Sequence, residues 1–156
     1  MRIQNQKIGQ KGAAALEFAL VLPLLVLLTF GIIEFSLLLY NKAMLTNASR
    51  EGARAGIVFS DPRADDAYIK TKVEAYCSTY LITFGSGSGI PLSDDDIDIT
   101  PIESNRLDTD VSPPGTPMTV TVRYHYDFLV LPNIPLGPIG LKDGITLRAV
   151  TVMRME

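Results

Sequence analysis

The sequence contains one cysteine, one histidine and no tryptophan. One cysteine excludes a disulfide within the chain, and a lone cysteine with a lone histidine excludes a zinc site built from these residue types. The 14 lysines and arginines are outnumbered by 17 acidic residues, which argues against a nucleic-acid partner. Neither a G-x-S-x-G motif nor a glycine-rich phosphate loop occurs. We therefore expect no enzyme activity, no cofactor, no metal site and no small-molecule substrate.

What the chain does have is an apolar block near its N-terminus. Residues 1–12 contain three basic residues and no acidic one, whereas residues 13–40 contain only two charges, Glu17 and Glu34. The 16 residues between these glutamates give about 24 Å of helix, and residues 35–40 extend it to the roughly 30 Å of a bilayer core. This span places Glu34 near the outer interface, and the basic leader predicts a cytoplasmic N-terminus.

Three interpretations of this apolar block differ in how they account for Glu17. A secretory signal peptide has a shorter apolar region and small residues at its cleavage site. A plain single-pass anchor fits the length but leaves Glu17 without a partner, at a cost of about 2.5–3.5 kcal/mol, unless its side chain reaches the inner interface. The run Gly12-AAALEF resembles the class III signal peptides of type IV pilins, in which a prepilin peptidase cuts after the glycine. That resemblance implies a mature chain beginning at Ala13, with Phe18 following the glutamate.

The same resemblance gives Glu17 a role after cleavage. The new amine of Ala13 is a positive charge one helical turn from the carboxylate. In an assembled filament Glu17 would neutralise the amine of a neighbouring subunit, where the low dielectric strengthens the pairing.

The helix is expected to continue to Phe59, because residues 41–59 contain no proline and mostly helix-forming residues. Ala48, Gly52 and Gly56 recur every four residues and form a strip of small side chains for close packing. Pro23 is expected to kink the apolar part. The whole helix would be about 70 Å long.

A second helix and a sheet are predicted behind this helix. Asp61 is the expected N-cap and Pro62 the first helical position. The helix would run to the glycine-serine stretch at residues 85–89, and Cys77 would lie buried on its apolar face. Alternating residues predict strands over 96–100, 118–128 and 145–154. The expected class is α+β, with a 1–12 leader, a 13–59 helix and a 60–156 extracytoplasmic domain whose antiparallel sheet of about three strands is covered by helices on one face.

Two polar clusters were candidates for chemistry. Asp94–Asp96 with Asp98 could hold Ca²⁺, but the segment lacks the glycine and the terminal glutamate of an EF-hand loop, which favours a solvated acidic loop. His125 and Asp127 share the polar face of a strand without a serine nucleophile, so an exposed or sheet-packed histidine is favoured.

Residues 12–59 resemble the TadE-like family, the minor pilins or pseudopilins of the tight-adherence (Tad/Flp) pilus. The most specific parts are ALEFALVLP, the pair Glu34-Phe35, and SREGAR with Arg50, Glu51 and Arg54. The resemblance implies a subunit of the bacterial inner membrane that is cut by a prepilin peptidase. Its other implied partners are membrane lipid, other Tad pilins and the Tad assembly platform, and the implied role is assembly of pili for surface adhesion and biofilms. The region after Ser60 favours an accessory subunit over the shorter shaft pilin.

A second function shares most of these features. A single-pass anchor could carry an outer domain that binds or senses a ligand, without any processing. Only the pilin interpretation requires Gly12 and Glu17, so removal of the leader separates the two.

Overall fold

The computed structural model describes residues 8–58, 63–83, 92–107, 113–129 and 144–155. It confirms the α+β class, with one long helix, a second helix and a three-stranded antiparallel sheet. A 3₁₀ turn, η1 (Asp94–Asp96), and a five-residue helix, α3 (Glu103–Leu107), were not predicted.

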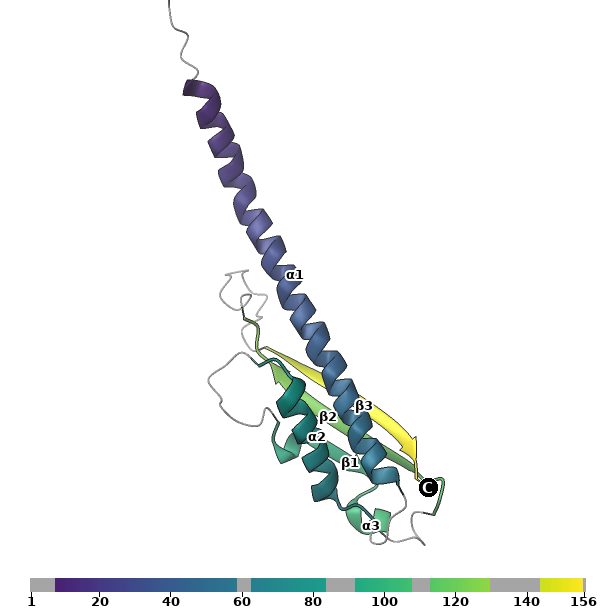
Figure 1. The fold of residues 1–156 in the computed structure, drawn as a ribbon. Coiled ribbons are helices and arrows are strands. Elements are labelled where there is room, and N and C mark those ends of the chain that lie inside the picture. The colour runs from purple at the N-terminus through teal and green to yellow at the C-terminus, as the bar shows by residue number, and fades with distance from the viewer. Residues whose placement is uncertain (1–7, 59–62, 84–91, 108–112, 130–143, 156) are drawn as a thin grey trace, which may run out of the picture.

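The long helix α1 (Ile8–Ile57) has two parts with different surroundings. Its C-terminal half packs on the domain, whereas its N-terminal half extends beyond the domain (Figure 1). The helix continues through Pro23. By length and composition the helix from Gly12 to Ile57 contains an 18-residue stretch apolar enough to cross a membrane, with a mean hydropathy of 2.5. One polypeptide helix therefore serves both as a candidate membrane anchor and as part of the domain core.

The second helix, α2 (Asp66–Tyr80), begins later than predicted. Its N-cap is Asp65, whose Oδ1 accepts a hydrogen bond from the Tyr68 backbone N–H at 2.8 Å. Asp61, the predicted N-cap, lies outside the described residues, and residues 63–65 are not helical, so that prediction was wrong. Both aspartates are suitable cap residues by sequence, and the structure assigns the cap of α2 to Asp65.

α2 also ends before the predicted glycine-serine stretch. After Tyr80 the backbone becomes extended at Leu81. Both backbone polar groups of Ile82 bond to the side chain of Asn41 on α1, with the amide donating to the carbonyl at 2.7 Å and its oxygen accepting from the N–H at 2.9 Å. These bonds replace the next helical turn.

The sheet has the order β1-β2-β3, from β1 (Ile97–Thr100), β2 (Pro117–Tyr126) and β3 (Ile145–Arg154). In the antiparallel register Ile99 lies opposite Val120, and Val122 opposite Ala149. The predicted strands are present with end shifts of one or two residues. β1 starts after Asp96 because that side chain accepts from the backbone N–H and the hydroxyl of Ser93, both at 2.9 Å, and closes the η1 turn.

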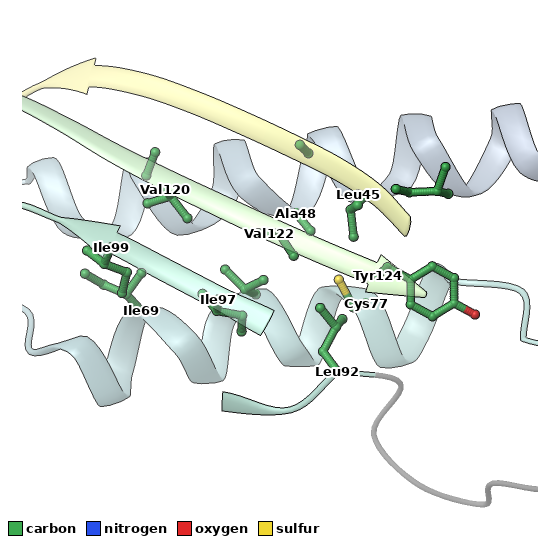
Figure 2. Packing of buried hydrophobic residues seen from close by; sticks show 14 of the residues in the cluster. Leu45, Ala48, Ile69, Cys77, Leu92, Ile97, Ile99, Val120, Val122 and Tyr124 are labelled. Atoms are coloured by element: carbon green, nitrogen blue, oxygen red, sulfur yellow. The ribbon is translucent and has the colours of Figure 1, made fainter. Parts of the chain in front are cut away.

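The core lies between the two helices and one face of the sheet (Figure 2). Ile69, Val73 and Cys77 of α2 point into it, as the predicted apolar face requires. Cys77 is a buried free thiol, which confirms the expected burial. Burial raises the pKa of this thiol to about 12, so thiol-labelling reagents report opening of the domain.

The small-residue strip of α1 lies where the helix approaches α2 and β2 most closely. Ala48, Gly52 and Gly56 are all buried. A Cβ on Gly52 would be 2.5 Å from Cγ2 of Val73, and one on Gly56 would be 2.8 Å from Cδ1 of Ile69. The two glycines therefore let the helix backbone contact its neighbours directly.

Gly52→Val is expected to lower the free energy of unfolding by about 1–3 kcal/mol, because the added methyls overlap the stiff side chain of Val73. The rate of Cys77 labelling in increasing urea measures this change. Gly31→Val is the matched control, since a Cβ there meets nothing within 4 Å. Equal stability of the two variants would contradict a packing role for Gly52.

Candidate functional site

The predicted processing segment lies in the N-terminal half of α1. Gly12, Ala13, Glu17 and Phe18 are all exposed, and a Cβ on Gly12 would meet nothing within 4 Å. Ala13 and Glu17 are four residues apart in the helix and therefore lie on the same side. The segment is accessible to a peptidase and to a neighbouring chain.

The uncovered part of α1 has the length of a membrane core. Every side chain over residues 13–30 is exposed, and the first buried residue of the helix after them is Glu34. Residues 13–33 give about 31 Å of helix at 1.5 Å per residue, close to the roughly 30 Å of bilayer hydrocarbon. This uncovered segment contains a single charged residue, Glu17.

Glu34 is part of the domain core, a burial that the sequence analysis did not predict. Its side chain is 1% exposed. Oε1 accepts a hydrogen bond from the Tyr126 hydroxyl at 2.8 Å, and both carboxylate oxygens accept from the Leu129 backbone N–H at 3.0 and 3.1 Å. Glu34 thus ties α1 to the end of β2, and Leu37 and Leu38 of the next helical turn pack against the domain core.

The Glu34 contact also changes the electrostatics of Tyr126. Burial raises the pKa of the Tyr126 phenol well above its usual range, and the hydrogen bond to Glu34 and its negative charge raise it further. The phenol therefore stays protonated and donates to the carboxylate. The Tyr126 ring also packs edge-on against Phe128, with centroids 5.7 Å apart.

Other polar residues of α1 fix its position on the domain, and sequence reasoning did not identify them. Asn41 is fully buried and bonds to Ile82, as described above. The Ser49 hydroxyl lies 2.7 Å from that of Thr151 on β3, and the Lys42 ammonium donates to the Arg148 carbonyl. Glu34, Asn41 and Ser49 are therefore polar anchor points along the buried face of the helix.

The remaining motif residues face outward. Phe35, Arg50, Glu51 and Arg54 are exposed on α1. The basic side chain of Arg54 lies in the last turn of the helix, where a positive charge is favourable. These side chains are available to contacts outside the chain.

The acidic residues near β1 serve separate contacts. Asp96 caps η1, Asp98 pairs with Arg123 at 3.1 Å, and Asp94 lies 3.8 Å from Lys70. His125 and Asp127 form an exposed pair, with Nε2 3.4 Å from Oδ1. Within the described ranges, no three metal-ligating side chains gather at one point.

The comparison with protein families found a match that lies within α1. Residues 12–54 match the family model described as TadE-like protein. No curated protein and no solved structure matched the chain. The matched segment begins at Gly12 and contains the uncovered helix, Glu34, Ala48 and Gly52, so the resemblance found in the sequence is confirmed over this range. Residues 12–54 of the chain are therefore similar to TadE-like proteins.

Proposed function

We propose that the chain is a minor pilin of a Tad pilus, anchored in the bacterial inner membrane by α1 with its domain outside. The proposal rests chiefly on the family match, which begins at Gly12, directly before the uncovered helix. The only charge in that uncovered helix is Glu17, four residues after the proposed new N-terminus. Such a charge in an apolar helix calls for a partner, and the freed amine of another subunit supplies one.

The proposed role is structural and not enzymatic. The domain buries its face of the sheet against α1 and α2, and α1 contributes Leu45, Ala48 and Ala53 to the same core. A domain built around its own membrane helix moves with that helix when a platform extracts it. This coupling suits an accessory subunit that joins other Tad pilins in pili for surface adhesion.

Replacement of Gly12 tests the processing step. Gly12→Ser is expected to leave an uncut precursor in the membrane fraction, because the proposed peptidase cuts after this glycine. Immunoblots of membranes from cells with the Tad machinery would show the longer chain. Gly31→Ser, at a second helical glycine where a Cβ meets nothing within 4 Å, would be cut normally. Equal cleavage of the wild-type chain and Gly12→Ser would contradict the proposed site.

A further inference from the structure

An exposed apolar surface surrounds the point where the domain meets the uncovered half of α1. It consists of Phe35, Leu129 and Ile145, which together form the apolar collar. Their exposed fractions are 61%, 46% and 44%. Exposed apolar side chains that lie together mark a contact surface, whereas single scattered ones are common on any protein.

The three collar residues come from different elements, and each is linked to Glu34, Ile145 through its strand partner Tyr126. Phe35 follows Glu34 in α1, and the Leu129 backbone N–H donates to the Glu34 carboxylate. Ile145 lies opposite Tyr126 in the β2–β3 register, and the Tyr126 hydroxyl donates to the same carboxylate. The buried hydrogen bonds of Glu34 therefore hold the collar at one level along the helix.

That level coincides with the end of the uncovered helix. The collar begins directly after residue 33, about 31 Å along α1 from Ala13. Figure 1 shows the paired ends of β2 and β3 next to the middle of α1, on the side toward its projecting half. Along α1 the collar follows directly on the exposed apolar side chains of Ile32 and Ile33.

We propose that the apolar collar rests on the outer leaflet, with its side chains in the interfacial layer of the bilayer. This inference rests on the proposed membrane anchoring. Aromatic and aliphatic side chains favour this layer when they adjoin a spanning helix. The polar neighbours His125 and Asp127 lie 3.4 Å apart and are more than half exposed, which suits the headgroup region. Contact with lipid would hold the domain at a fixed height until the subunit leaves the membrane.

Single tryptophans test the proposal, because the chain has none of its own. Leu129→Trp and Ile145→Trp report the collar, and Leu24→Trp reports the uncovered helix. Leu107→Trp on α3, at the opposite end of the domain, is the matched control, since Leu107 is 42% exposed against 46% for Leu129. The full chain is reconstituted in phosphatidylcholine vesicles with bromine at shallow or deep acyl positions.

The collar tryptophans are expected to lose fluorescence to shallow bromines, with blue-shifted emission. Leu24→Trp should respond to deep bromines, and Leu107→Trp only to aqueous iodide. Quenching of both collar tryptophans by iodide alone would overturn the proposal, while a quenched Leu24→Trp would leave the anchor intact. Shielding from bromine and iodide alike would identify a protein neighbour and would also overturn it. An unquenched Leu24→Trp would contradict the anchor itself.

Discussion

Glu34→Ala is expected to lower the free energy of unfolding of the domain by about 2–4 kcal/mol. The substitution leaves the buried Tyr126 hydroxyl and the Leu129 N–H without their carboxylate acceptor, and hydrogen bonds to a charged group contribute about 1.5–3 kcal/mol each. Labelling of Cys77 in urea measures the loss in detergent-solubilised protein. The expected result is a midpoint shifted to clearly lower urea.

A double-mutant cycle with Tyr126→Phe separates this contact from general damage to the helix. The two single variants and the double variant should be non-additive, because both singles remove the same hydrogen bond. Glu51→Ala, an exposed carboxylate on the same helix, should change stability by no more than about 0.5 kcal/mol. Full additivity, or a loss at Glu34 no larger than at Glu51, would show that Glu34 does not hold α1 on the domain.

Glu17→Ala is expected to leave membrane insertion intact and to reduce recovery of the subunit in sheared pili roughly tenfold or more. Removing a charge from the span lowers the cost of insertion. A filament contact that loses about 1.4 kcal/mol of charge pairing weakens tenfold. Quantitative immunoblots of sheared filaments and of membranes measure both effects in one set of cells.

Asp95→Ala is the control, because Asp95 is an exposed carboxylate of the domain and lies outside the residues that match the family model. It should appear in filaments at the wild-type level. Unchanged recovery of Glu17→Ala would remove the charge-pairing role. Loss of Glu17→Ala from the membrane fraction would mean that this residue acts in insertion instead of assembly.

The class of the fold and the run of its elements could be predicted because each depends on local patterns. Alternation over β2 and β3 and the apolar face of Ile69, Val73 and Cys77 are regular enough to identify without the structure. The N-cap of α2 was misplaced because Asp61 and Asp65 offer the same local chemistry. The hydrogen bond from the Tyr68 N–H identifies Asp65 as the cap.

Glu34 and Asn41 were not recognised as core residues because their partners lie far away in the sequence. Tyr126 is 92 residues from Glu34, and Ile82 is 41 residues from Asn41. The spacing of residues along α1 nevertheless indicated that both side chains are buried. Extending the Ala48-Gly52 strip toward the N-terminus in steps of three and four residues passes through Leu45, Asn41, Leu38 and Glu34, which all lie on the packed side of α1.

The mass and N-terminal sequence of the protein purified from native membranes test the central claim most directly. A processed Tad minor pilin begins at Ala13 and lacks the mass of the 12 leader residues. A chain that still begins at Met1, in cells that cut their other pilins, would contradict the proposed function and favour an unprocessed anchor with a binding domain.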